Sequence, residues 1–564
     1  ERTALYRGDA VAAIVGDAAA VAAFDEADFP ISWEPLETML TPDAALVATA
    51  PRLHENRAGN ILVRGYVECG DADSALAGAA HRVEIETSTP FVEHAYIEPE
   101  AGYAQREGNR LVVYGCTQAA QMDRESLADI MGLDLDAIRV MPSACGGGFG
   151  SKLDVSFQPY VALAAWILGR PARICYSRGE SMRASTKRHP SSIRLTVGAD
   201  ETGRISGFVF DGVFNTGAYA SWGPTVANRV PIHACGPYFT PDYKANSVAV
   251  HTNAPPAGAF RGFGVPQSAV AQELAYDRLA ENLGMDRLAF RRLNALKNDM
   301  RTVTGQVFES GVGIDDCLAA LEERWHDALQ AAETFNKTAK ETGDNWRKGV
   351  GIGACWYGCG NTSLPNPSTM RMGITPDGRL VLHQGAMDIG QGANTVITQI
   401  AADAFGVPVH LVEIVDGDTD LTPDCGKTSA SRQTFVSGKA ALLAGTLLRQ
   451  EVLRHANVDA DANIVFDGNS LVLTAPSQAG TRIDLAQLAV NDHGYVFMAE
   501  ETYDPPTSAL DDKGQGVPYA VYGYGAQIME LMVDTELGVV RLDRVTTAHD
   551  VGRAINPLLV EGQI

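Results

Sequence analysis

The sequence predicts a multi-domain protein of the α+β class. Its 564 residues exceed the roughly 250–300 residues that one hydrophobic core usually serves, so two to four domains are expected. Segments that alternate apolar and polar residues, such as 83–88, occur beside segments with helical periodicity, such as 157–168. Hydrophobic residues make up 45% and charged residues 20% of the chain, which is typical of a globular protein.

Charge and hydropathy exclude several classes of partner. The formal net charge is −24, and the acidic residues are spread along the chain. This argues against nucleic acid and against anionic membrane surfaces as partners. The longest apolar run, 160–168, is far shorter than the roughly 20 residues that span a bilayer. No membrane insertion is therefore expected.

The nine cysteines are thinly spread. Cys355 and Cys359 are separated by three residues, but no second pair lies nearby to complete a four-ligand site. The pattern predicts that the chain carries no zinc or iron–sulfur cluster of its own. It is also typical of a cytoplasmic protein with reduced thiols.

Residues 1–80 are predicted to be the remainder of a small N-terminal α+β domain. Residues 9–15 have the pattern of a strand, 18–24 of a helix and 31–36 of a further extended segment. There is no signal peptide and no initiator Met, so the first residues are expected to lie in the middle of a protein.

Residues 81–335 are predicted to form the first large domain, and its centre is the glycine loop Gly146-Gly-Gly-Phe-Gly150. An apolar strand precedes this loop and a helix follows it. Two phosphate-binding motifs fail here, because Lys152 is not preceded by glycine and the glycine spacing is not G-x-G-x-x-G. The loop predicts close backbone approach to an anionic or electron-rich ligand; the alternative is a purely structural turn.

A histidine flanked by carboxylates also lies in this domain. Glu93, His94, Glu98 and Glu100 could suggest a metal site, but their spacing does not place them on one helical face. A buried or rim histidine is the preferred interpretation.

Two arginines occur in unexpectedly apolar surroundings. Arg229 lies in Val226–Ile232, and Arg261 lies in the second glycine cluster, Ala259-Phe-Arg-Gly-Phe-Gly264. A buried guanidinium without an anionic partner is costly, so each should pair with a carboxylate or point at a ligand. Together they predict a pocket for an anionic or oxyanion-forming substrate.

The second half repeats the pattern of a loop before a helix. Residues 336–348 are polar and predict a linker, and 349–564 are assigned to a second large domain. Two further polar loops precede helices there, 384–395 with Gln391 and Asn394, and 424–433. Four junctions of this kind predict one extended polar cofactor threaded between the domains.

Taken together, these motifs resemble the molybdenum-binding large subunit of the xanthine dehydrogenase family. The resemblance rests on four segments in order: Gly146–Gly150, Ala259–Gly264, Asp388-Ile-Gly-Gln-Gly392 and Thr428-Ser-Ala-Ser431. Within the family, Gly217-Ala-Tyr-Ala-Ser221, Trp356–Pro367, Thr428–Thr434 and Ala548-His-Asp-Val-Gly552 are most similar to nicotinate dehydrogenase.

The resemblance implies an oxidoreductase that inserts water-derived oxygen into an electron-poor carbon of a nicotinate- or purine-like N-heterocycle. It implies molybdopterin cytosine dinucleotide with a sulfido- or selenido-bearing molybdenum as cofactor. Because the pterin dithiolene holds the metal, no side chain is assigned as a metal ligand. A [2Fe–2S] centre and FAD on partner subunits would accept the electrons, so a hetero-oligomer is expected.

The resemblance also assigns roles to individual residues. Phe149, Gly150 and Arg261 would lie beside the molybdenum ligands, Arg229 would face the substrate, and Phe263 would form a wall that positions the substrate ring; the catalytic group is therefore Arg229, Arg261 and Phe263. The residues assigned to the cofactor are Gly147, Gly148, Phe149, Gly150, Arg261, Gly390, Gln391, Gly392, Ser429, Ala430 and Ser431.

Three departures from the family pattern bear on the substrate and the base. Leu153 stands where xanthine enzymes carry a substrate-binding Glu, and Val92 where many relatives carry a Gln. The family's catalytic Glu, in a Gly-Val-Gly-Glu type motif, does not occur, and Glu561 is not an expected substitute. The sequence is therefore interpreted as a fragment, or as a subunit completed elsewhere. The alternatives are an aldehyde oxidoreductase of the same family and a non-catalytic subunit that carries the cofactor.

Overall fold

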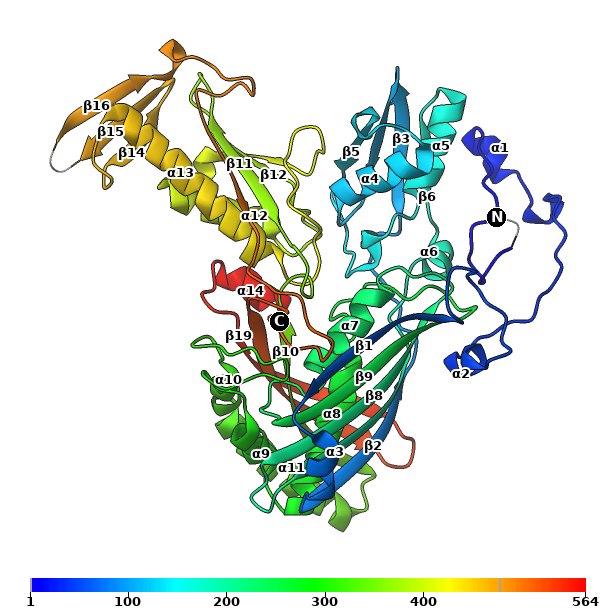
Figure 1. Ribbon diagram of the computed structural model, residues 1–564. Helices are drawn as coiled ribbons and strands as arrows, with labels where there is room; N and C mark the ends of the chain where they lie inside the picture. The colour runs from blue at the N-terminus through cyan, green and yellow to red at the C-terminus, as the bar shows by residue number, and fades with distance from the viewer. Residues whose placement is uncertain (1–2, 476–477) are drawn as a thin grey trace.

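The computed structural model describes residues 3–475 and 478–564. Figure 1 shows a large lower body with two smaller lobes above it, one from each half of the chain. The lower body contains a five-stranded sheet with α7 (Gly223–His233) and α8 (Val265–Leu283) packed on it. Its strands, in spatial order, are β1 (Ile61–Cys69), β9 (Asp242–His251), β8 (Ile205–Gly217), β7 (Ser191–Ala199) and β2 (His81–Thr89).

The first small lobe holds the first glycine loop. Its four-stranded sheet has the order β5 (Ile138–Pro142), β4 (Arg110–Gly115), β3 (Ala101–Glu107), β6 (Ala172–Cys175), with β4 and β5 parallel. The helices α4 (Ala120–Met131) and α5 (Gln158–Leu168) pack on this sheet. The short α6 (Arg178–Ala184) leads from the lobe back to the lower body.

The second small lobe comes from the second half of the chain. Its sheet has the order β13 (Val412–Asp416), β12 (Leu380–Gln384), β11 (Ser368–Ile374), β17 (Phe497–Tyr503). Two packed helices, α12 (Ala393–Phe405) and α13 (Gly438–Ala456), belong to it, and a π-helical turn (Gln433–Ser437) precedes α13. A small outer sheet is formed by β14 (Asn463–Asp467), β15 (Ser470–Ala475) and β16 (Gln478–Asp484).

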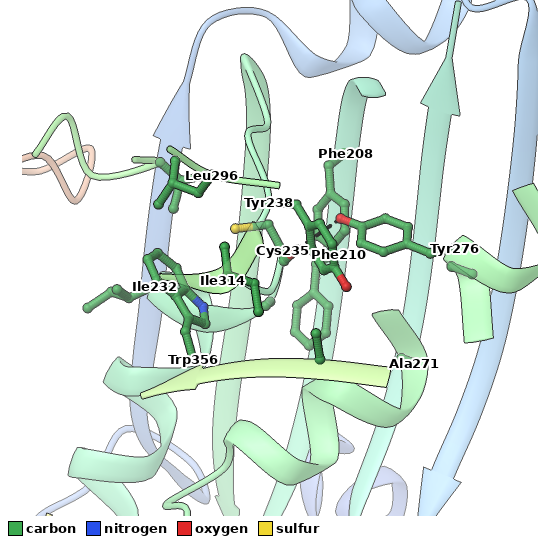
Figure 2. Close-up of a cluster of buried hydrophobic side chains, with 14 of the residues drawn as sticks. Phe208, Phe210, Ile232, Cys235, Tyr238, Ala271, Tyr276, Leu296, Ile314 and Trp356 are labelled. Atoms are coloured by element: carbon green, nitrogen blue, oxygen red, sulfur yellow. Dashed lines mark hydrogen bonds between the residues drawn. The ribbon is translucent and has the colours of Figure 1, made fainter. Parts of the chain in front are cut away.

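A third sheet of the second half joins the lower body. It consists of β10 (Trp346–Gly358), β18 (Tyr522–Asp534) and β19 (Val540–Asp550). The helices around it are α9 (Arg287–Asn294), α10 (Ile314–Ala320), α11 (Glu322–Thr342) and the C-terminal α14 (Pro557–Gln563). In the buried cluster of Figure 2, Phe208 from β8 and Ile232 from α7 share one core with Trp356 from β10. The two halves are therefore joined by a common hydrophobic core.

Several expected elements differ from the structure. The predicted linker 336–348 is the last turns of α11 and the start of β10. The sequence suggested a linker because residues 336–342 add only Ala339 to the buried stripe of α11, whose other members are Trp325, Ala328 and Ala332. Residues 9–15 and 31–36 form no strand, and the helix expected at 18–24 is α1 (Ala18–Ala22). The short helices α2 (Pro42–Leu46) and α3 (Ala72–Ala77) complete this part.

The large sheet also begins earlier than the predicted domain. Strand β1 pairs with β9 along its whole length, so the sheet starts before the boundary that the sequence suggested at residue 80. Among the described residues, no helix is both long and apolar enough to cross a membrane.

Candidate functional site

The first glycine loop connects β5 to α5, and two of its glycines are required by neighbouring protein atoms. A Cβ at Gly148 would lie 2.4 Å from the Oε1 atom of Gln118. A Cβ at Gly150, whose φ is +117°, would lie 2.5 Å from the carbonyl oxygen of Ala259. The loop is thus shaped by close packing against two other segments; the sequence had left open both approach of a ligand and a purely structural turn.

The second glycine cluster packs directly on the first. The Arg261 amide donates to the Phe149 carbonyl at 2.9 Å, which places the two loops side by side. The Arg261 side chain is exposed, and its Nη2 donates to the Gln563 carbonyl at 3.3 Å. The expectation of a buried Arg261 is therefore wrong: the turn around Gly262 (φ +101°) directs the guanidinium out of the apolar run.

Arg229 is buried as expected, but its partners are backbone carbonyls. Its Nη1 donates to the Gly358 carbonyl at 2.8 Å and its Nη2 to the Gly360 carbonyl at 2.6 Å. The guanidinium carbon lies 4.6 Å from the Tyr357 ring centroid and 5.7 Å from that of Phe263. A cation held by carbonyls and aromatic faces keeps its charge in a dry environment.

His233 lies one helical turn after Arg229 on α7 and binds the same strand end. Its Nε2 accepts from the Gly358 amide at 3.0 Å, so its Nδ1 carries the proton and donates to the Arg229 carbonyl at 2.9 Å. Burial and the Arg229 charge lower the pKa of His233 to about 3. Sequence reasoning missed this residue, although its spacing of four from Arg229 was visible.

The Thr428–Ser431 turn faces these groups from the second half. Ala430 and Ser431 have φ values of +52° and +55°, a conformation that non-glycine residues rarely adopt. The Ala430 carbonyl accepts from the Gly360 amide at 2.8 Å. Gln118 ties this turn to the first glycine loop, since its Nε2 donates to the Thr428 carbonyl at 2.8 Å. A polar residue three positions after the end of the buried strand β4 was the signal that could have identified Gln118.

The loop with Gly390, Gln391 and Gly392 is the last of the four predicted loops. The side-chain amide of Gln391 bonds within its own loop. Its Oε1 accepts from the backbone amide of Ile389 at 2.7 Å, and its Nε2 donates to the Met387 carbonyl at 3.0 Å. A Cβ at Gly392 would lie 2.8 Å from Leu559 of α14, whereas one at Gly390 would meet only open space. Gly390 is thus the member of this loop that leaves room for a ligand.

All four predicted loops therefore meet in one place. Hydrogen bonds connect Phe149 to Arg261, Gly150 through Gln118 to Thr428, and Thr428 to Met387 in the loop before α12. Arg229 is connected through Gly360 to Ala430. Four site residues that are not glycine have φ between +42° and +55°. This strained backbone conformation costs about 1–3 kcal/mol per residue and is typical of functional sites. These residues are Phe149, Phe263, Ala430 and Ser431.

Unsatisfied polar atoms lie in the Thr428–Ser431 turn, in the loop after β10 and on α7. Among the described residues, Ser429 Oγ, Ser363 Oγ and Arg229 Nε are buried without a hydrogen-bond partner. Buried polar groups are normally paired, so these atoms and the open backbone at Gly390 fit an extended polar ligand such as a pterin.

His94 and the two departures from the family pattern lie at the edge of this region. As expected, His94 is buried: its ring stacks on Phe260 with centroids 4.0 Å apart, and its Nε2 lies 2.8 Å from the Ala259 carbonyl. Burial lowers its pKa to about 3. Leu153 is buried in the large core, and Val92 is 41% exposed and bridges Arg188 through its backbone.

Comparisons with known proteins agree with this geometry. Two models of the molybdopterin cofactor-binding domain match residues 53–295 and 319–564. The xanthine dehydrogenase molybdenum-binding subunit of Escherichia coli O157:H7 is 31% identical over 574 residues, covering 99% of this chain and 73% of that protein. The nicotinate dehydrogenase large molybdopterin subunit of Eubacterium barkeri is 38% identical over 319 residues, 55% of this chain and 74% of that protein.

The fold is also that of a solved relative. The aldehyde oxidoreductase of Desulfovibrio gigas superposes with a TM-score of 0.82 at 25% identity, over 94% of this chain. The present chain spans only 56% of that structure. From the two domain matches and the similarity over nearly its whole length, the chain belongs to the xanthine dehydrogenase family of molybdenum hydroxylases, among their molybdopterin-binding subunits.

Proposed function

We propose that the chain is the molybdopterin-binding subunit of an enzyme that inserts water-derived oxygen into an electron-poor carbon of an N-heterocycle. The observation that carries this proposal is the meeting of four polar loops, drawn from both halves, one of which is connected through Gly360 to the buried Arg229. Two relatives are named for xanthine and nicotinate, and both of these compounds are nitrogen heterocycles.

The proposed cofactor is molybdopterin cytosine dinucleotide, with a sulfido or selenido ligand on molybdenum. When bound, this group supplies the oxygen-transfer chemistry and accepts two electrons. The groups proposed to hold it are the backbone of Gly147–Gly150, the open turn at Gly390 and the Ser429–Ser431 turn. In this last turn, Ser429 Oγ is buried without a hydrogen-bond partner in the protein. Gln391 supports its loop from within.

The chain's own residues would position the substrate and stabilise charge. Negative charge grows on an electron-poor ring as oxygen adds to it, and a guanidinium fixed in a dry pocket stabilises that charge without rearranging. Arg229 meets this requirement because its carbonyl partners and aromatic neighbours fix its plane. The Phe263 ring beside it provides a flat wall against which a heterocycle can stack.

Oxidation of an aldehyde is the second candidate. The specific observation in its favour is the high structural similarity to the Desulfovibrio gigas aldehyde oxidoreductase. Leu153 in place of a carboxylate also removes one polar contact that a purine would use. An aldehyde substrate would place its carbonyl carbon where the ring carbon is proposed to lie.

Electrons are proposed to leave through a [2Fe–2S] centre and FAD on partner subunits of a cytoplasmic hetero-oligomer. A relative from Paenarthrobacter nicotinovorans, 30% identical over 545 residues, is named a subunit of the 6-hydroxypseudooxynicotine dehydrogenase complex. All nine cysteines of this chain are free thiols, which is typical of a reducing compartment.

The test is to purify the complete complex and measure molybdenum and oxidised pterin per chain, followed by a panel of substrates with an artificial electron acceptor. Nicotinate and purines should be oxidised faster than aldehydes. Turnover of aldehydes alone would select the second candidate. A fully assembled complex with neither molybdenum nor pterin would reject both.

A further inference from the structure

Lys427 is a half-buried cation that lies directly before the Thr428–Ser431 turn. Among the described residues it forms no ion pair and no hydrogen bond, and its ammonium lies 5.0 Å from the centroid of the Trp222 ring. Burial and the Arg432 charge lower the pKa of Lys427, and Asp424 offsets this only in part. A cation removed from water is costly unless an anion joins it. A ligand is therefore the expected source of the missing anion.

The Trp222 ring is fixed beside this cation. Trp222 lies at the N-terminal end of α7 and packs on the large core. The preceding residue, Ser221, has a φ of +40° and donates from its Oγ to the Asp154 carboxylate at 2.7 Å. A Cβ at Gly258 would lie 2.1 Å from the same Oγ. These contacts hold the backbone that carries the ring, and they engage Asp154 with Ser221 and not with Lys427.

Arg229 lies on the same side of α7 as Trp222. Seven residues, about two helical turns, separate them, so their side chains leave the helix in nearly the same direction. Trp222 meets the second half of the chain at Lys427. Arg229 meets it at Gly360, whose amide in turn donates to the Ala430 carbonyl in the turn that follows Lys427. The ammonium and the guanidinium therefore border one region between α7 and the turn.

Apolar side chains accompany these two cations. Phe263 lies beside Arg229, and Leu153 belongs to the same buried cluster on which Trp222 packs. Leu153 offers no carboxylate at the position where the family resemblance leads one to expect a substrate-binding Glu. Aromatic faces suit a flat ring, and an ammonium offers donors to an anionic substituent of that ring. A phosphate would use the ammonium but not the indole, so the combination favours an aromatic carboxylate.

We propose that Lys427 binds the carboxylate of the substrate and that Trp222 supports its ring, so that the enzyme selects an N-heterocycle bearing a carboxylate over a neutral one. This inference rests on the proposed function and names its substrate class. In a half-buried setting, a charge-assisted hydrogen bond from the ammonium is stronger than one exposed to water. The bound carboxylate supplies the anion that the described part of the chain does not.

Two substitutions and two ligands isolate this contact. Lys427→Met keeps nearly the length of the side chain and removes its charge, whereas Lys427→Arg keeps the charge. Nicotinate and nicotinamide share one ring and differ in the charge of one substituent. Lys439→Met is the matched control, because Lys439 is an exposed lysine at the start of α13.

Wild type and the three variants are prepared as the complete complex. The measurements are molybdenum and pterin content, kcat/KM for both compounds with an artificial acceptor, and calorimetric binding of both compounds. Wild type should prefer nicotinate. In Lys427→Met this preference should fall about 10–100-fold in kcat/KM and in Kd, as for loss of one hydrogen bond to a charged group. Lys427→Arg should retain most of the preference, and Lys439→Met should match wild type.

The same preference in Lys427→Met as in wild type, or none in wild type, would overturn the inference and leave Lys427 solvated by water. Loss of molybdenum and pterin in Lys427→Met would assign the ammonium to a cofactor phosphate and also overturn it. If Lys427→Met fails to assemble, the wild-type preference and its loss in high salt decide, since salt screens the ammonium. If wild type binds nicotinate preferentially but oxidises neither compound, the proposed function fails while the carboxylate subsite stands.

Discussion

Two of the contacts that connect the halves of the molecule beside the site, here called the buried joint and the exposed joint, use opposite physics. In the buried joint, Arg229 and His233 of α7 bind Gly358 and Gly360 at the end of β10. In the exposed joint, which is only partly open to solvent, Arg110 and Arg139 of the first small lobe pair with Asp420 and the buried Asp418. Thr419 also bonds to the backbone of edge strand β5. The buried joint has no carboxylate, whereas the exposed joint depends on carboxylates.

The difference between the two joints indicates which of them is expected to fix the geometry of the site. Removing a buried partner leaves carbonyls that water cannot reach, so the whole desolvation penalty appears. Removing an exposed partner lets water replace it, and salt already screens the pair. The buried joint should therefore fix the geometry around Phe263, while the exposed joint should only limit how the lobes move.

The largest effect is expected for Arg229→Leu. Two buried carbonyls, those of Gly358 and Gly360, would lose their donors, and each unsatisfied acceptor costs about 1–3 kcal/mol. We expect a loss of about 2–6 kcal/mol in the free energy of unfolding, together with loss of turnover. Urea unfolding of the chain measures the first and steady-state kinetics of the complex the second.

Arg229→Lys separates the charge of Arg229 from its planar shape. Lys keeps the charge but offers a point donor where two carbonyls need a planar fork. The variant should fold and retain cofactor while its kcat falls by about 10²–10³, as for loss of one preorganised donor. Unchanged turnover would remove Arg229 from the reaction and leave it a structural residue of the buried joint.

Acid should destabilise the buried joint. The folded pKa of His233 is about 3, below the ordinary value of about 6.5, so the unfolded chain binds a proton that the folded chain excludes. Stability should therefore fall as the pH drops from about 6.5 toward 3. His94 and His189, whose pKa values burial also lowers to about 3, add to this slope.

The check is the unfolding free energy of the chain from pH 7 to 4. His233→Gln keeps an acceptor for the Gly358 amide and should flatten the slope. His326→Gln, at an exposed position outside the joint, serves as the control substitution. An equal slope in all three proteins would mean that His233 does not couple pH to stability.

Gly148→Ala tests the interior of the first glycine loop. The added Cβ would lie 2.4 Å from Gln118 Oε1, and such overpacking costs about 1–3 kcal/mol. Shortening the obstructing side chain should relieve it, so Gly148→Ala should cost less in a Gln118→Ala background than alone. Additive losses in this double-mutant cycle would show that the glycine is required for another reason.

The sequence predicted the class of fold and the loops that meet, because glycine spacing and apolar periodicity are local properties. It also predicted that Arg229 and His94 are buried, since their neighbours are apolar. It could not predict that Arg261 points outward, because a single turn at Gly262 decides this. The sequence could not predict the partners of Arg229 either. Gly358 lies 129 residues away in the chain, and every residue has a backbone carbonyl, so residue type does not identify the acceptor.

Arg139→Gln should have the smallest effect. Arg139 is 26% exposed in its side chain, and its Nε donates to Asp418 Oδ1 at 3.0 Å. Exposed ion pairs contribute about 0–1 kcal/mol, and Thr419 would still hold β5 through the Val140 backbone at 2.9 and 3.1 Å. We therefore expect a loss of less than about 1 kcal/mol that disappears in 1 M salt, where the Debye length is about 3 Å. Unfolding at low and high salt measures it. A loss as large as that of Arg229→Leu, insensitive to salt, would mean that the two joints are energetically equivalent and that burial does not separate them.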